Sequence, residues 1–139
     1  MKFLVGCLML TFVLAAPHRS AEACTGCRAP TLTSSARFVD TVFSGTIANI
    51  GGGGRGELTV TVDGVWKGTV GATVVVTIAD RGCKFVAPIK PRTGRAFVFT
   101  ARTAGGGGLA VDRCNSLWPA THKNRASLVR MFGAHRPPS

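Results

Sequence analysis

Four cysteines beyond the first 23 residues are the side chains of this 139-residue chain with the clearest potential for chemistry. Cys24 and Cys27 are nearly adjacent, whereas Cys83 and Cys114 are each single and distant in the sequence. Thiols in this arrangement can pair as disulfides, bind a metal ion or act as a redox-active Cys-x-x-Cys motif. The compartment in which the chain folds decides among these possibilities, because disulfides persist in oxidising surroundings.

The N-terminus indicates export. Met1 and Lys2 form a short positive start, and an apolar stretch of 14 residues follows from Phe3 to Ala16. This is the layout of a secretory signal peptide, and the stretch is shorter than the roughly 18 residues that a membrane-spanning helix needs. We therefore expect a secreted protein, located in the periplasm or at the cell surface if it is bacterial, with no stable membrane insertion.

Two cleavage sites fit the preference for small residues before the cut. Ala21-Glu22-Ala23 places cleavage directly before Cys24, and Leu14-Ala15-Ala16 is a competing site upstream. The first site makes residues 1–23 the predicted signal peptide. We expect the remaining residues 24–139 to form a single domain.

In an exported chain the even number of mature cysteines makes two disulfides the default expectation. Spacing alone leaves all three pairings open. A redox Cys-x-x-Cys usually opens a helix in a βαβ unit, and Pro30 together with the strand-rich sequence disfavours that reading. A zinc site would favour a second close cysteine pair over the single Cys83 and Cys114.

Strand signals dominate the mature chain. Glu57 to Asp63 alternates strictly, with leucine and valine at every second position, which predicts a half-buried strand. Residues 105–108 and 51–54 are glycine runs that we expect to connect strands, since neither is followed by the Lys-Ser/Thr pair of a phosphate loop. The five predicted strands are 42–50, 57–63, 73–78, 96–100 and 109–114. Five short strands favour a compact barrel, and a five-stranded Greek-key barrel is one such solution.

One short helix is predicted near the C-terminus. Between Ala126 and Ala134, the apolar residues Leu128, Met131 and Phe132 recur at helical spacing, so this segment is expected to pack one face on the sheet. Residues 135–139 are expected to form a frayed tail.

The positive charge of the mature chain bears on its binding partners. The mature chain carries 15 basic and 5 acidic side chains, a net charge of +10. Export disfavours nucleic acid as a natural partner, so anionic glycans, acidic proteins or anionic membrane surfaces are the candidates. The basic residues are spread along the sequence and gather only at 84–95 and 122–130, which favours a solvated surface with weak affinity for polyanions.

The sequence contains no signature of an enzyme. A nucleophile elbow, an HExxH motif and paired carboxylates are all missing, and the five mature acidic residues are isolated. His122 is interpreted as a surface residue, Trp66 and Trp118 as packing residues. Asp40 is expected to make a local hydrogen bond before the first strand. We expect neither catalysis nor a cofactor.

Taken in order, these features resemble the netrin-like module, and within it the N-terminal domain of the tissue inhibitors of metalloproteinases. The resemblance covers nearly all of residues 24–118 and depends on the order and spacing of several short motifs. These are Cys24 directly after the signal peptide with Cys27 beside it, Phe38-x-Asp40-x-Val42-Phe43-x-Gly45, Val65-Trp66-Lys67-Gly68, Cys83-x-Phe85, Ala96-Phe97-Val98-Phe99 and Cys114-Asn115-Ser116.

The resemblance implies an OB-fold-like barrel and the disulfides Cys24–Cys83 and Cys27–Cys114. It also implies inhibition in trans, in which the α-amine and carbonyl oxygen of Cys24 bind the active-site zinc of a metalloprotease and Thr25 enters the specificity pocket. The zinc belongs to the target, so no metal or other cofactor of its own is implied. The inhibitors have Cys-x-Cys, whereas Gly26 lengthens the spacing here by one residue.

The alternative is an extracellular binding or adhesion module. Such a protein would use the same barrel and its basic surface for anionic glycans or acidic proteins, without inhibiting a protease.

Overall fold

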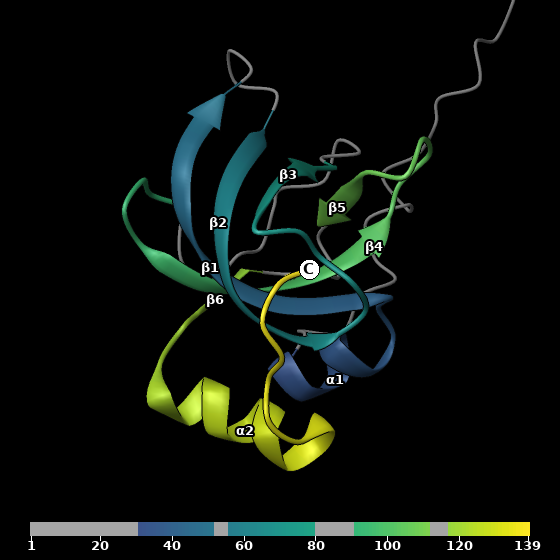
Figure 1. Ribbon diagram of the computed structural model, residues 1–139, viewed down its shortest axis with the longest axis vertical. Helices are drawn as coiled ribbons and strands as arrows, with labels where there is room; N and C mark the ends of the chain where they lie inside the picture. Colours follow the sequence, from purple (N-terminus) through teal and green to yellow (C-terminus); the bar gives the residue numbers. More distant parts are fainter. Residues whose placement is uncertain (1–30, 52–55, 80–90, 112–116) are drawn as a thin grey trace, which may run out of the picture.

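The computed structural model describes residues 31–51, 56–79, 91–111 and 117–139. These residues form a curved sheet with two helices packed side by side below one end of it (Figure 1). The elements in chain order are α1 (Leu32–Arg37), β1 (Thr41–Gly51), β2 (Glu57–Lys67), β3 (Thr73–Ile78), β4 (Ala96–Thr103), β5 (Leu109–Val111), β6 (Leu117–Pro119) and α2 (His122–Phe132).

Five of the strands close into a barrel. β1, β2 and β3 follow one another as antiparallel neighbours, β3 pairs with β5 in parallel, and β5 pairs antiparallel with β4. β4 then pairs antiparallel with β1, which removes the open edges of the sheet. The predicted all-β, five-stranded OB-fold-like barrel with a short C-terminal helix is confirmed.

The strands form where the sequence alternates or is continuously apolar. In β2 the side chains of Leu58, Val60 and Val62 are buried, while Glu57 and Thr61 are exposed. Inside the barrel the rings of Phe43 and Phe99 stack with centroids 4.9 Å apart, so β1 and β4 meet at the centre of the core. Burial of this apolar surface is the main force that holds the barrel closed.

A second core lies outside the barrel, between the sheet and the helices. It combines the outward-facing Val42 and Val98 of β1 and β4 with apolar residues of both helices. Trp66 belongs to this second core, while its neighbour Val65 faces the barrel interior. Its buried members are Leu32, Ala36, Val39, Val42, Trp66, Val98 and Leu128.

Several boundaries differ from the sequence-based prediction. β2 continues to Lys67, because register shifts in the pairing with β1 let the strand bend and keep its bonds beyond Asp63. α1 and β6 were not predicted, and each is short. α2 begins at His122 instead of Ala126, since Thr121 caps it by accepting a hydrogen bond from the Asn124 N–H.

The predicted frayed tail is wrong. Arg136 exchanges two backbone hydrogen bonds with Val65, of 2.8 and 2.9 Å, and the N–H of Ser139 donates to the carbonyl of Val70 at 3.0 Å. The ring of His135 lies on Trp66 with centroids 5.5 Å apart. The end of the chain therefore returns to the half of β2 that β3 leaves unpaired.

Gly45 is the tightest point of the β1–β2 pair. A Cβ at this position would lie 2.4 Å from the carbonyl oxygen of Thr61, whereas one at Gly105 would meet nothing within 4 Å. We expect Gly45→Ala to lower the free energy of unfolding by about 2–3 kcal/mol in urea titrations, because backbone must move to admit the methyl group. Gly105→Ala is the matched control and should stay within about 0.5 kcal/mol of wild type.

A chain that ends at Gly133 tests the tail. It loses the backbone bonds to Val65 and Val70 and uncovers Trp66, so we expect the midpoint of thermal unfolding to fall by several degrees, about 1–3 kcal/mol. Arg136→Ala, which retains the backbone bonds, should cost less. Equal midpoints for the shortened and full chains would contradict a docked tail.

Candidate functional site

The predicted zinc-binding edge lies outside the residues that the structure describes. This holds for Cys24 and Thr25 and for both predicted disulfides, Cys24–Cys83 and Cys27–Cys114. The description begins at Thr31, so the structure shows the frame to which this edge is attached.

That frame starts with α1. Thr31 and Ser34 form a reciprocal capping box, in which the Ser34 N–H donates to Thr31 Oγ1 at 3.1 Å and the Thr31 N–H donates to Ser34 Oγ at 3.0 Å. Leu32 and Ala36 are buried in the second core. The segment that precedes Thr31 is therefore joined to the barrel through a capped and packed helix.

A polar cluster connects the barrel to α2. The Ser44 hydroxyl on β1 is buried and donates to Asp63 on β2. Arg125 of α2 donates to the same carboxylate at 3.0 Å and to Ser44 Oγ at 3.2 Å. We call these three residues the Asp63 cluster. The sequence analysis treated Asp63 as isolated, because its partners lie 19 and 62 residues away.

The cluster also sets the protonation of its carboxyl group. Burial alone would raise the pKa of Asp63, but the hydrogen bonds from Arg125 and Ser44 and the positive charges of Arg125 and His135 outweigh it, so the pKa lies below its ordinary value. Asp63 is thus ionised at neutral pH, and the pair holds α2 against the strands.

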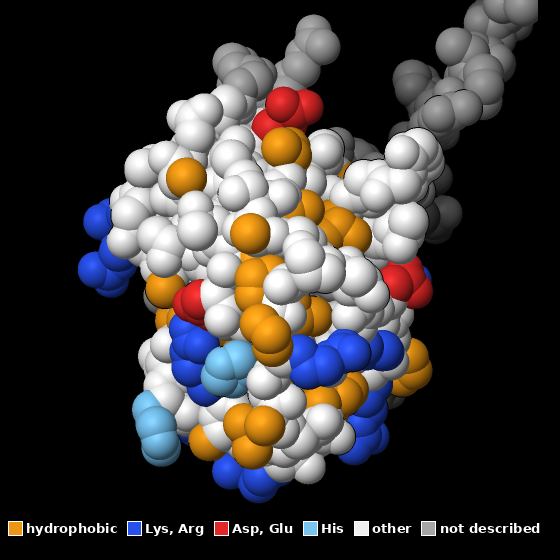
Figure 2. All heavy atoms as spheres, in the orientation of Figure 1, with side chains coloured by type: hydrophobic (Ala, Val, Ile, Leu, Met, Phe, Trp, Pro, Cys, Tyr) orange, Lys and Arg blue, Asp and Glu red, His pale blue; other side chains and the backbone are white. Residues whose placement is uncertain are grey.

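Two other basic side chains bond to backbone carbonyl oxygens near the end of β2. Lys67 Nζ donates to the carbonyl oxygen of Arg37 at 3.2 Å, and Arg136 Nη2 donates to the carbonyl oxygen of Gly68 at 2.9 Å. Figure 2 shows lysine and arginine side chains in a band across the molecule, level with the junction of barrel and helices.

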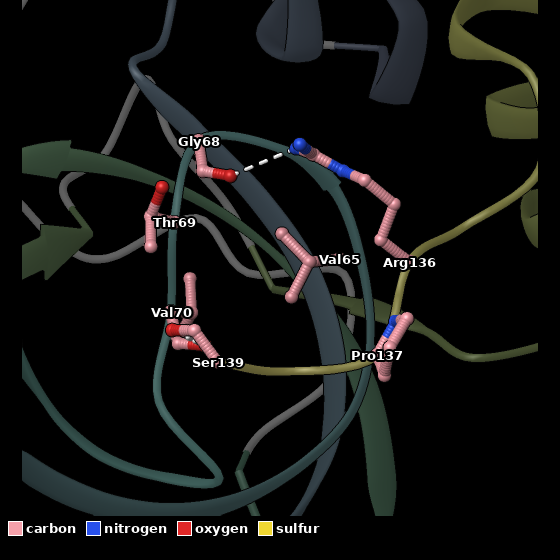
Figure 3. A pocket seen from close by; sticks show the side chains of 7 residues that line it. All are labelled: Val65, Gly68, Thr69, Val70, Arg136, Pro137 and Ser139. Atoms are coloured by element: carbon pink, nitrogen blue, oxygen red, sulfur yellow. Dashed lines mark hydrogen bonds between the residues drawn. The ribbon is translucent and has the colours of Figure 1, made fainter.

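The docked tail borders a small, partly open pocket. Figure 3 shows Arg136 and Pro137 on one side of it and Gly68, Thr69 and Val70 on the other, with Val65 between. Its volume is about 90 Å³, well below the roughly 300 Å³ at which pockets for small ligands begin. This cavity is therefore too small for an ordinary substrate and reflects the way in which the tail crosses β2.

The other residues singled out in the sequence take structural positions. His122 is exposed at the start of α2, and Trp66 and Trp118 pack in and against the second core, as predicted. The predicted local bond of Asp40 is wrong: its carboxylate accepts the N–H of Thr103, 63 residues away at the end of β4, at 3.0 Å.

Among the described residues, no three His, Cys, Asp or Glu side chains lie close enough to hold a metal ion. In the same part of the chain, no helix is long and apolar enough to cross a membrane.

Two comparisons with known proteins identified no relative of this chain. A scan against protein-family models and a search of curated proteins both gave no match. The resemblance to the netrin-like module stays a prediction from the sequence motifs.

Asp63→Asn tests the Asp63 cluster. A carboxyl whose pKa is lowered by folding stabilises the protein above its unfolded-state pKa of about 3.9, and this contribution disappears as the pH falls through the folded-state value. The Asp63 side chain is 45% exposed, so solvent screens the pair. We expect the variant to lose about 0.5–1 kcal/mol of unfolding free energy near neutral pH, with the deficit shrinking below about pH 4.

Denaturant titrations at both pH values measure this difference. Glu57→Gln is the control, because Glu57 is an exposed carboxylate on the same strand with no ion pair within the described residues. A deficit for Asp63→Asn that stays constant into acid would contradict the assignment.

Proposed function

We propose that the mature protein is a secreted inhibitor that binds the active-site zinc of a metalloprotease in trans through Cys24. In this proposal the α-amine and carbonyl oxygen of Cys24 occupy the coordination position that a catalytic zinc leaves open for water or substrate. Thr25 contacts the specificity pocket of the target. The disulfides Cys24–Cys83 and Cys27–Cys114 hold this edge on the barrel.

The observation that carries the proposal is the closed barrel, together with the helix that follows the cysteine segment in the sequence. An OB-fold-like barrel is what the resemblance to the inhibitors implies, and five strands of this chain close into one. α1 follows Cys27 by a few residues and is buried along Leu32 and Ala36. A short edge anchored to a packed helix would lose little conformational entropy on binding, which favours tight inhibition.

The chemistry of the amine fits a role near neutral pH. A free α-amino group has a reference pKa of about 7.7–8.0, so a substantial fraction is unprotonated and able to donate to zinc. An α-amine that is joined to a preceding residue loses this donor, because it becomes a peptide N–H. The proposal therefore requires cleavage of the signal peptide directly before Cys24.

The first experiment defines the N-terminus and the disulfides. The intact mass of the secreted, unreduced protein and peptide mapping should give a chain that starts at Cys24, with Cys24–Cys83 and Cys27–Cys114 paired. A chain that starts at Pro17, or a Cys24–Cys27 bridge, would contradict the proposal, because the amine would then be absent or misplaced.

Inhibition is tested with that chain on a panel of zinc metalloproteases. We expect inhibition at micromolar concentration or below, and a loss of at least 100-fold when one alanine is added before Cys24, because the amine becomes an amide. The matched control carries the same alanine at the C-terminus. Deletion of Gly26, which gives the inhibitors' Cys-x-Cys spacing, should strengthen inhibition. Equal inhibition by both alanine-extended chains would refute zinc binding through Cys24.

A further inference from the structure

We propose that residues 65–70 form a docking site for an extended segment of another protein, and that the C-terminal tail occupies this site until such a segment replaces it. Residues 65–70, which we call the bend, comprise the end of β2 and the turn that follows it. The tail, residues 135–139, crosses the bend (Figure 3). The site uses no residue of the Cys24 edge, so it is independent of the proposed inhibition.

The bend presents backbone hydrogen-bonding groups to its occupant. Val65 uses both its N–H and its carbonyl oxygen on the backbone of Arg136, at 2.9 and 2.8 Å. The carbonyl oxygen of Gly68 accepts from the Arg136 side chain at 2.9 Å. The carbonyl oxygen of Val70 accepts from the N–H of Ser139 at 3.0 Å. Bonds to the main chain of a sheet edge are how such edges bind extended peptides of varied sequence.

The tail covers the bend but stays at the surface itself. Val65, Trp66 and Val70 of the bend are buried. By contrast, Arg136 is exposed, and so is His135, whose ring lies against the indole of Trp66. Both cores, as far as the structure describes them, are built without tail residues. Replacing the tail by another segment therefore removes no side chain from either core.

The tail also fills the bend incompletely. A partly open pocket of about 90 Å³ remains beside Val65, Val70 and Pro137 (Figure 3). Within the described part of the chain, Nε1 of Trp66 is buried without a hydrogen-bond partner, although His135 lies against the same indole. Unfilled apolar space and an unpaired buried N–H both weaken an interaction. A segment shaped for this site would therefore bind it better than the tail does.

Gly133 joins the tail to α2 as a hinge. Its φ of 83° and ψ of −167° form a combination that is essentially restricted to glycine. α2 ends at Phe132, and the pair of Arg125 with Asp63 holds this helix on the strands. A conformational change at Gly133 can therefore release the tail while α2 stays in place.

The pocket indicates which segment would replace the tail. A long apolar side chain at the position of Pro137, such as leucine, reaches further than the proline ring and fills the space beside Val65 and Val70. A second copy of this chain is disfavoured as the occupant, because it carries the same proline. It also carries the same 17 basic against 6 acidic residues, so the two copies repel each other.

The first test measures the binding of a synthetic peptide with the sequence of residues 134–139 to two variants of the full mature chain. Arg136→Pro removes the N–H that donates to Val65 and so releases the tail, whereas Arg136→Ala removes the same charge and retains the N–H. We expect Arg136→Pro to bind the peptide at least tenfold more tightly, because the docked tail competes in cis. Equal affinities, or no binding to a folded Arg136→Pro chain, would overturn the proposal.

Gly133→Ala is a second variant in case Arg136→Pro does not fold. Alanine strains the conformation that returns the tail to the bend, and the sequence of the tail is unchanged. We expect this variant to bind the peptide at least threefold more tightly than wild type does. Gly105→Ala, at an open position, should match wild type. Wild-type affinity for Gly133→Ala would contradict a tail that competes for the bend.

Changes in the peptide test the class of occupant. A peptide with Pro137→Leu should bind at least threefold more tightly than the tail sequence, because leucine fills the pocket. A peptide that is N-methylated at Arg136 lacks the donor to Val65 and should bind at least fivefold more weakly. No gain from leucine, or no loss from methylation, would overturn the assigned occupant. Sedimentation tests the second copy: a dimer of the full chain that Arg136→Pro abolishes would assign the bend to self-association instead.

Amide hydrogen exchange follows the replacement in the unaltered mature chain. With the leucine peptide in excess, the N–H of Val65 should stay protected, because its acceptor changes from the tail to the peptide, while the N–H of Ser139 should lose its protection. Unchanged protection of Ser139 at saturating peptide would show binding elsewhere and overturn the proposal. The chain with alanine before Cys24 should behave identically, so the inhibitor proposal can fail while this one holds.

Discussion

The double pairing of β1 is the constraint on which the rest of the structure depends. This one strand bonds to β2 along one edge and to β4 along the other, and so closes the barrel. To do so it must bend, and register shifts with β2 occur on both sides of Ser44. Gly45 lies at this bend, where the backbone of β2 leaves no room for a side chain. The barrel core and the outer face that receives the helices both follow from this bend.

The two cores have different roles: one stabilises the barrel, and the other supports the helices outside it. Phe43 and Phe99 fill the barrel interior, while Val42 and Val98, their neighbours on the same strands, support α1 and α2 from outside. Because helix α1 follows the cysteine segment and the tail after α2 returns to β2, both ends of the described chain are tied to the same strands. A binding surface near these ends is therefore carried on a rigid support.

Charge is arranged so that one pair is structural and others stay available. Arg125 is neutralised by Asp63 and serves to fix α2. Lys67 and Arg136 have backbone carbonyls as partners instead, which orient these side chains without cancelling their charge. A chain with 17 basic and 6 acidic residues cannot pair every cation, so the fold decides which ones remain free to attract an anion.

The sequence by itself determined the class of the fold. β3 was predicted with its observed limits, and β1, β2 and β4 within a few residues, because alternating or β-branched runs specify strands through local burial alone. The tertiary structure decided the extension of β2, the docking of residues 135–139, the short α1 and β6, and the partners of Asp63, Lys67 and Arg136. Each of these depends on contacts between segments far apart in the sequence, and the periodicity of a single segment contains no information about them. The same reason keeps the Cys24 edge a prediction, since spacing alone leaves all pairings of the four cysteines open.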